Sequence, residues 1–282
     1  MKTAYHKIIN SIESLKLRLH VLKMRLGNHY VLRQNRKLYH HITWSKNQKQ
    51  EFNAYWKQHY GKKISSKGHK YYESMNGCHH KDYFPEILYA TKLEPKLNKF
   101  KYAEVYSDKN LFPIVYARSK ELYIPKTYIF NAGGKYYDSN RKPMAYASVL
   151  ETLKNIGEVV IKPSIGGSEG KGVVFCNLID GLETIENRPM TDVLKSYNID
   201  FLIQEAVNQH PSFARLHPAS LNTIRVITYI AEDDVHCTPL CMRMGTGSAK
   251  VDNLGAGGII IGLSAEGELN KYAYKLGAST DK

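Results

Sequence analysis

The stretch IKPSIGGSEGKGV, residues 161–173, is the most informative part of the chain. It joins two short runs of mostly apolar residues, 158–162 and 173–176, through a segment rich in glycine. Such runs are typical of β-strands, so the stretch predicts a flexible hairpin that can cover phosphate groups with backbone N–H groups. The alternative is a mobile surface hairpin that binds nothing.

The hairpin differs from two common phosphate-binding motifs. A P-loop needs Gly at the position of Ile165 and Ser or Thr after Gly-Lys, whereas Gly172 follows Lys171. A dinucleotide fingerprint would lead directly into a helix. Lys162 stands at the end of a strand of buried type, one residue before Pro163. A solvated lysine has no obvious reason to occur there, which favours a phosphate-binding role.

The flanking sequence predicts further strands and one helix. Strands are expected at 114–117, 127–130, 201–207, 221–229 and 240–245, and a helix at 148–155. Two of these strands each contain one arginine among apolar residues, Arg225 and Arg243. A polar segment that ends in two glycines, residues 251–258, precedes the next apolar run.

Six elements in this order resemble the ATP-grasp superfamily. The closest resemblance is to its sugar-transfer-associated branch, which is related to α-L-glutamate ligases. The elements are Asp108-Lys109-Asn110, IKPSIGGSEGKGV at 161–173, QEAV at 204–207, HPASLNTIRVIT at 217–228, RMG at 243–245 and VDNLGAGG at 251–258. Together they cover about residues 84–265. The resemblance implies an α+β fold in which two subdomains grip a nucleotide.

The resemblance also implies roles for individual residues. Lys109 and Lys162 would contact the phosphates, because ammonium groups neutralise a triphosphate well. The glycine-rich loop would close over the β- and γ-phosphates; its cofactor-binding residues are Gly166, Gly167, Ser168, Gly170, Lys171 and Gly172. A hinge would hold adenine, largely through backbone groups; its residues are Gln204, Glu205 and Val207. Taken alone, Lys109 would be a surface lysine and Glu205 an ordinary carboxylate at a strand end.

The catalytic end of the site would contain Arg225, Arg243 and Asn253. The two guanidinium groups would face the transferred phosphoryl group. Asn253, with the glycine pair at 257–258, would hold the acceptor. Each arginine could equally be a buried ion-pair partner, and the glycines could simply form a tight turn. The implied reaction is ATP-dependent ligation of a small carboxylate or sugar substrate through an acyl phosphate, in cell-surface polysaccharide or glycan synthesis.

The expected cofactors are ATP and Mg²⁺, but the metal ligands are not evident. In the family they are a late Asp followed by Glu-x-Asn. Beyond Gly258 the acidic residues are Glu266, Glu268 and Asp281. The triplet at 268–270 has the right letters but lies in an expected hairpin tip. We therefore expect a chain that is incomplete at its C-terminus, with the ligands beyond it. The alternative is a catalytically silent nucleotide-binding protein.

The net charge of +14 is concentrated at the N-terminal end of the 282 residues. Residues 1–82 contain 17 Lys/Arg and 4 Asp/Glu, a balance of +13, and residues 83–282 contain 23 and 22, a balance of +1. This division predicts a basic helical region at 1–82 and an ATP-grasp domain at 83–282. A basic adaptor that binds an anionic polymer is a further alternative for the function.

An apolar stripe predicts a helix at the N-terminus. Its members recur at spacings of 4, 3, 4, 3 and 4 and are Ile8, Ile12, Leu15, Leu19, Leu22 and Leu26; Gly27-Asn28 is expected to end the helix. The stripe could dock on its own domain, form a short coiled-coil dimer, or contact an anionic membrane surface or polymer. The basic and aromatic residues that follow could bind nucleic acid, although no known signature is present.

The remaining composition is that of a soluble cytoplasmic protein. Hydrophobic residues make up 43% of the chain, and the longest apolar runs fall far short of the ~18–20 residues of a membrane span. The first residues lack a signal-peptide pattern. The four cysteines are too scattered for a disulfide framework. The cluster Cys78-His79-His80 lacks a second pair of ligands at metal-binding spacing.

Overall fold

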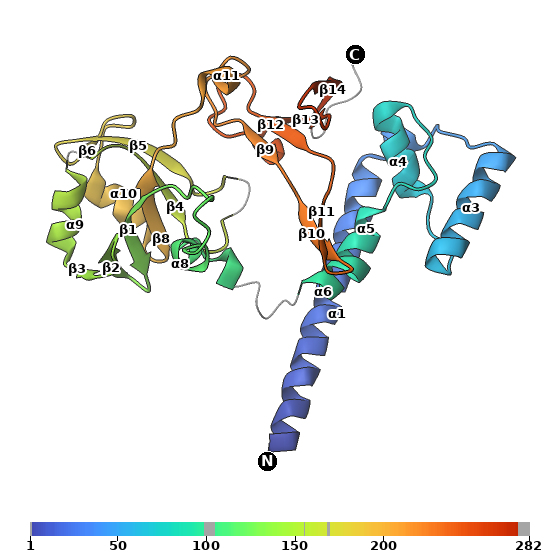
Figure 1. Cartoon of the computed structure of the whole chain (residues 1–282), viewed down its shortest axis with the longest axis horizontal. Helices are drawn as coiled ribbons and strands as arrows, with labels where there is room; N and C mark the ends of the chain where they lie inside the picture. Colours follow the sequence, from blue (N-terminus) through green and yellow to red (C-terminus); the bar gives the residue numbers. More distant parts are fainter. Residues whose placement is uncertain (1, 99–104, 155, 168–169, 276–282) are drawn as a thin grey trace. The chain divides into compact units, whose positions relative to one another are not determined.

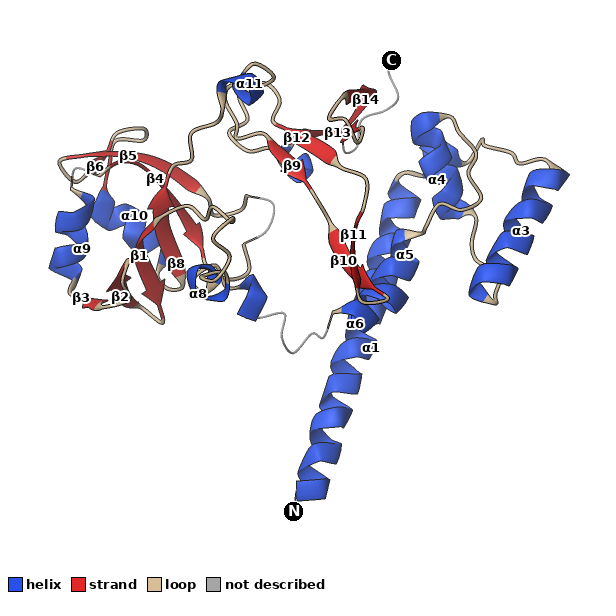
Figure 2. Ribbon diagram, in the orientation of Figure 1, coloured by secondary structure: helices blue, strands red, loops and turns tan. Residues whose placement is uncertain are grey.

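The computed structural model describes residues 2–98, 105–154, 156–167 and 170–275. The chain divides into two compact units between Phe100 and Lys101. The compositional boundary at residue 82 therefore lies inside the first unit. Figure 2 shows that the described elements of the first unit are helical and that the strands belong to the second.

The first unit consists of one long helix followed by shorter ones. Their bounds are α1 Lys2–Gln34, α2 Arg36–Tyr39, α3 Lys46–Tyr60, α4 Lys67–Asn76, α5 Glu86–Leu88, the π-helix η1 Tyr89–Leu93 and α6 Glu94–Leu97. Ser45 begins α3 with a capping box: its side chain accepts from the Gln48 N–H, and its own N–H donates to Gln48 Oε1. Gly61 and Gly77 end α3 and α4 at φ +73°, a conformation that glycine adopts without strain.

The expected end of the first helix at Gly27-Asn28 is wrong. Helix α1 continues to Gln34, and Gly27 lies inside it. A glycine within a helix costs only about 1 kcal/mol. Packing offsets this cost, because α1 contacts η1, α2, α4 and α5. The Tyr39 hydroxyl also donates to the Leu32 carbonyl at 2.9 Å.

The core of the first unit is aromatic. Trp44, Phe52 and Trp56 are buried together, and the indole N–H groups donate to Glu73 at 2.6 Å and to the Lys81 carbonyl at 2.8 Å. His69 is also buried, with its ring edge-to-face against Phe52 at 4.8 Å between centroids. Burial lowers the pKa of His69 to about 4 from its usual 6.5.

His69 should make the first unit sensitive to acid. The native state binds fewer protons than the unfolded state between pH 6.5 and 4, so stability should fall as the pH is lowered through that window, by up to about 3 kcal/mol. Urea unfolding at pH 7 and pH 5 would test this by tryptophan fluorescence, since both tryptophans lie in this core. The variant His69→Phe should lose most of the pH dependence, whereas His59→Gln, at an exposed position, should keep it.

The second unit begins with an eight-stranded antiparallel sheet in the order β3-β2-β1-β8-β4-β5-β6-β7. The strands are β1 Thr127–Ala132, β2 Lys135–Asp138, β3 Pro143–Met144, β4 Gly157–Pro163, β5 Val174–Ile179, β6 Leu182–Glu183, β7 Arg188–Pro189 and β8 Phe201–Glu205. Helices α9 (Tyr146–Leu153) and α10 (Met190–Tyr197) cover one face (Figure 1). The predicted hairpin of two strands around the glycine-rich segment is confirmed, because β4 pairs with β5.

Strict alternation along β4 decides which side chains reach the other face of this sheet. Val159 and Ile161 are fully buried in the core with α9 and α10. Val160 and Lys162 therefore point to the opposite face, which we call the open face. Lys162 is the Cα partner of Leu202, and Val160 that of Gln204. These four side chains share the open face.

A second sheet follows, in the order β14-β13-β12-β9. Its strands are β9 Thr223–Arg225, β12 Cys241–Met244, β13 Ile259–Leu263 and β14 Leu269–Lys275, and a separate hairpin contains β10 Thr228–Ala231 and β11 Asp234–Cys237. Met242, Met244 and Ile261 pack with Phe213 of α11 (Pro211–Ala214) on one face. Arg243 alternates with these methionines and projects from the other face.

Two expectations for the strands are wrong. The predicted strand at 114–117 is replaced by helix α8, Phe112–Val115, because Pro113 in the first turn favours a helix start and outweighs the branched Ile114 and Val115. The predicted strand at 221–229 is two strands, β9 and β10, which belong to different sheets. The helix expected at 148–155 corresponds to α9.

Gly258 is fixed by three backbone oxygens. A Cβ atom there would lie 2.7 Å from the Asp252 carbonyl oxygen and 2.8 Å from those of Asn253 and Met244. The short 3₁₀ helix η2, Leu254–Ala256, ends at Gly257 with φ +90°. Only glycine fits this close approach of three backbone segments.

Substitution of Gly258 by alanine should destabilise the second unit, because backbone rather than a flexible side chain would have to move. We expect Gly258→Ala to lower the free energy of unfolding by about 2 kcal/mol or more. Calorimetry would show this as a lower melting temperature. Gly27→Ala is the control: it lies inside α1 with no atom within 4 Å of a new Cβ and should stabilise by about 0.5–1 kcal/mol.

Candidate nucleotide-binding site

Two lysines meet at the open face of the first sheet. The backbone N–H of Lys109 donates to the Ser164 carbonyl at 3.0 Å, and its ammonium group donates to the same oxygen at 3.3 Å. Ser164 follows directly after β4, so this contact brings Lys109 to Lys162. Burial lowers the pKa of Lys162, and the charge of Lys109 lowers it further. Two ammonium groups held together form a site for an anion.

Buried polar atoms near these lysines lack partners among the described residues. They are Asn110 Oδ1 and Ser164 Oγ. Asn110 is tied to the same region, because its amide nitrogen donates to the Asn131 carbonyl at 2.9 Å. An unsatisfied buried polar atom costs about 1–3 kcal/mol. Such atoms beside a cationic pair suit a polar, anionic ligand such as the phosphates of ATP.

Arg141 adds a third cation to this region. Its guanidinium lies 4.4 Å from the centroid of the Phe130 ring and donates to the Asn110 carbonyl. Burial lowers the pKa of Arg141, while Asp108 acts in the opposite direction. No local sequence pattern marks Arg141, because it occupies an ordinary turn between β2 and β3.

The glycine-rich loop connects the lysines to the second sheet. Gly166, Gly170 and Gly172 have φ between +71° and +74°, and a Cβ on Gly172 would lie 2.9 Å from Pro163. A Cβ on Gly170 would lie 3.4 Å from Val251, in the segment that leads to Asn253. The other loop residues expected to bind the cofactor are Gly167, which lies against Pro163, Lys171, and Ser168, which lies outside the described residues.

The side chains of the predicted adenine hinge are hydrogen-bonded to the segment that leads into β1. The side-chain nitrogen of Gln204 donates to Thr127 Oγ1 at 2.8 Å and to the Pro125 carbonyl at 3.1 Å. The Glu205 carboxylate accepts from the Lys126 N–H at 2.6 Å and from the Tyr123 hydroxyl. The bond from Tyr123, and then that from Lys126, lower the pKa of Glu205. These side chains therefore fix the hinge backbone.

A pocket of about 350 Å³ opens beside this hinge. Glu158 lines it from the first sheet, Val207 from just after β8, and Gln209, Ser220 and Lys250 from the segments that follow. Its walls are a mixture of apolar and polar groups. A pocket of this size and character suits a small ligand such as a purine.

One wall of the pocket is built by a buried hydrogen-bond network. The Asn222 amide donates to the Phe213 and His217 carbonyls at 2.9 and 3.0 Å, and Ser220 Oγ donates to Asn222 Oδ1 at 3.0 Å. Ser220 Oγ also accepts from the Gly245 N–H at 3.0 Å. These contacts explain why polar residues occur in the HPASLN segment: they fold the wall rather than contact a ligand directly.

The predicted catalytic arginines share one face of the second sheet but have different surroundings. Arg243 donates to Asp252 Oδ1 at 3.0 Å, with both side chains 15% exposed. Thr223, the Cα partner of Arg243, donates to the other oxygen of Asp252. Arg225 is two residues further along β9 and is exposed, so its Cα lies roughly 7–8 Å diagonally from that of Arg243.

Asn253 follows Asp252 but uses its side chain locally. Its Oδ1 accepts from the Gly255 N–H at 2.7 Å and caps η2. Its carbonyl oxygen accepts from the Gly258 N–H at 2.8 Å. The structure thus brings Asn253 and Arg243 together through Asp252, a residue that the sequence reasoning did not single out.

The described residues do not by themselves fit a Mg²⁺ site. Within the described ranges, no group of three or more His, Cys, Asp or Glu side chains could hold a metal ion. Asp252, the acidic residue nearest the predicted catalytic groups in sequence, is engaged by Arg243 and Thr223. Glu268 lies in the turn between β13 and β14, as expected for a hairpin tip.

Sequence reasoning missed several residues that build the site. They are Arg141, Ser164, Lys250 and Asp252. Two of them, Ser164 and Asp252, stood within quoted motifs as loop residues, so a signal existed. Arg141 and Lys250 reach the site only through tertiary folding, and no local pattern marks them.

An α+β fold of antiparallel sheets, with a glycine-rich hairpin beside a lysine pair, is the architecture of an ATP-grasp domain. The family model for sugar-transfer associated ATP-grasp proteins matches residues 88–280, which is more than half of the chain. The chain therefore belongs to the sugar-transfer associated ATP-grasp family. A search of curated proteins found no match. No described helix is long and apolar enough to cross a membrane.

The ion pair between Arg243 and Asp252 should contribute measurably to stability. Asp252→Ala would leave a mostly buried guanidinium without its partner, which should cost about 3 kcal/mol. The exposed pair of Arg188 and Glu186, 2.6 Å apart, is the matched control. Glu186→Ala should cost less than about 1 kcal/mol. Chemical denaturation of both variants would check this, and equal losses would contradict it.

Proposed function

We propose that this chain binds ATP across the open face of the first sheet and uses it to activate a carboxylate for ligation. The family assignment supports an ATP-binding, ligase-like function in the context of sugar transfer. The observation that carries the proposal is the lysine pair, Lys109 and Lys162, beneath a glycine-rich hairpin. This pair would contact the phosphates, and Ser164 Oγ is a polar atom available beside it.

The spacing along β4 supports the direction in which the nucleotide would lie. Glu158, at the start of the strand, lines the hinge pocket, and Lys162 stands near its end. Four residues of strand span about 13 Å. That separation matches a purine at the hinge with its triphosphate extended toward the lysines. Val207 would contact the base at the pocket end.

The proposed chemistry is acyl-phosphate formation. A carboxylate oxygen of the substrate attacks the γ-phosphorus, and the bond from that phosphorus to the β,γ-bridging oxygen breaks to release ADP. An amine then attacks the carbonyl carbon, phosphate leaves, and the amine loses a proton to solvent. Arg225, exposed on its sheet, would contact the transferred phosphoryl group. Arg243, paired with Asp252, would lie beside Arg225 and face the same phosphoryl group. Asn253 would shape the acceptor end of the site through η2.

A second candidate function is nucleotide binding without turnover. The observation that favours it is the lack, within the described residues, of a cluster of carboxylates able to hold a metal ion. Trapping with hydroxylamine distinguishes the two, because an acyl phosphate yields a hydroxamate. ATP-analogue binding with no hydroxamate from any tested carboxylate would support the second candidate.

Lys162 should lower the stability of the free protein and raise its affinity for the nucleotide. Lys162→Met removes a charge that is buried beside Lys109, so the melting temperature of the free protein should rise. The same variant should bind a non-hydrolysable ATP analogue at least tenfold more weakly, which is about 1.4 kcal/mol. Calorimetric titration with and without Mg²⁺ would measure this.

The control for this titration is Lys154→Ala, an exposed lysine after α9. It removes the same charge from the same unit and should leave the affinity unchanged. Equal affinities of wild type and Lys162→Met, with both proteins folded, would contradict the placement of the phosphates. Equal losses in both variants would indicate a general charge effect.

A further inference from the structure

Helix α1 has two apolar surfaces, and its own unit uses one of them. Val21, Met24 and Leu32 are half-buried on the side that packs against the other helices of the unit. This packing anchors the C-terminal half of α1. It leaves a different side of the helix uncovered by the described elements of the unit.

The uncovered side is a continuous apolar line, here called the leucine stripe. Its described members and their exposed fractions are Ile12 49%, Leu15 57%, Leu19 57%, Leu22 53% and Leu26 62%. Spacings of three and four residues place them on one side of the helix over about 21 Å. A row of large apolar side chains this exposed marks an interaction surface.

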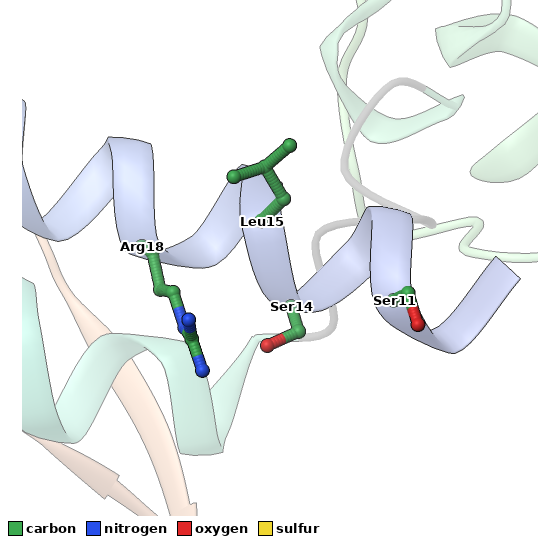
Figure 3. A pocket seen from close by; sticks show the side chains of 4 residues that line it. All are labelled: Ser11, Ser14, Leu15 and Arg18. Carbon is green, nitrogen blue, oxygen red and sulfur yellow. The ribbon is translucent and has the colours of Figure 1, made fainter. Parts of the chain in front are cut away.

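Basic residues border the leucine stripe on both sides. Lys16 and Lys23 follow Leu15 and Leu22, and Arg18 and Arg25 precede Leu19 and Leu26. Figure 3 shows Leu15 and Arg18 leaving α1 in different directions, with Ser14 on the side of Arg18. These two side chains, with Ser11 and Ser14, line an open hollow of about 440 Å³.

This arrangement of charge disfavours a second copy as the occupant. In a coiled coil the stripe would occupy the a and d positions, and the bordering residues would occupy e and g. The four basic residues at the e and g positions would then face the same lysines and arginines of the other helix. A nucleic acid would satisfy the charges but would leave the five apolar side chains in water.

We propose that α1 lies in the plane of an anionic lipid bilayer, with the leucine stripe at the boundary between headgroups and acyl chains. An apolar interior bordered by phosphates matches an apolar stripe bordered by long basic side chains. The lysine and arginine stems would lie along the apolar boundary while their charges reach the phosphates. The proposal requires surface binding alone and is independent of the reaction proposed above.

The test is co-sedimentation of the full chain with vesicles. Vesicles with about 30 mol% phosphatidylglycerol in phosphatidylcholine should bind the chain, and phosphatidylcholine alone should not. The variant Leu15→Gln/Leu19→Gln/Leu22→Gln should lose binding, since Gln keeps helix propensity while removing the apolar surface. The variant Lys16→Gln/Arg18→Gln/Lys23→Gln/Arg25→Gln should bind about fivefold more weakly per charge removed.

A matched variant removes four charges elsewhere in the same unit: Lys49→Gln/Lys57→Gln/Lys62→Gln/Lys63→Gln, all at exposed positions. It should retain most of the binding. Circular dichroism and tryptophan fluorescence would verify folding of each variant. Failure of the wild type to bind anionic vesicles overturns the proposal, and so does an equal loss in the matched variant. A dimer in light scattering that the glutamine substitutions abolish would identify a second copy as the occupant instead.

Discussion

The antiparallel pairing of β4 with β8 on one side and β5 on the other is the constraint on which the candidate site depends. Alternation along β4 places Val159 and Ile161 in the core and Lys162 on the open face. A shift of one residue in this register would bury the ammonium group and expose the core. The buried apolar residues therefore determine where the charge stands, and the loop that begins at Ser164 then receives Lys109.

The lysine pair lowers the stability of the free protein, and the rest of the fold must offset this loss. Two like charges lie together, one of them substantially buried, and polar atoms of Asn110 and Ser164 lack partners among the described residues. None of these features helps the free protein to fold. Their concentration in one place is characteristic of a site whose interactions are completed by a ligand.

Local patterns were sufficient to predict the parts of the fold that local forces determine. Apolar alternation and glycine identified β4, β5 and the loop between them, and the position of Lys162 before a proline marked it as unusual. Patterns failed where a tertiary contact outweighed them. Packing carries α1 through Gly27, and β9 and β10 separate because they join different sheets. Arg141 reaches the open face through a turn, and nothing in its sequence neighbours indicates where that turn lies.

The two hydrogen bonds that the Glu205 carboxylate accepts affect how a bound nucleotide would leave. One carboxylate holds both Tyr123 and Lys126, so the hinge has little freedom to move. The opposite end of β4 leads into a loop whose glycines permit large changes of backbone angle. The two ends of the open face therefore differ in stiffness: the hinge end is restrained, and the end at the glycine-rich loop is freer to change conformation. Exchange of ADP for ATP would begin with release of the polyphosphate, and departure of the base would follow.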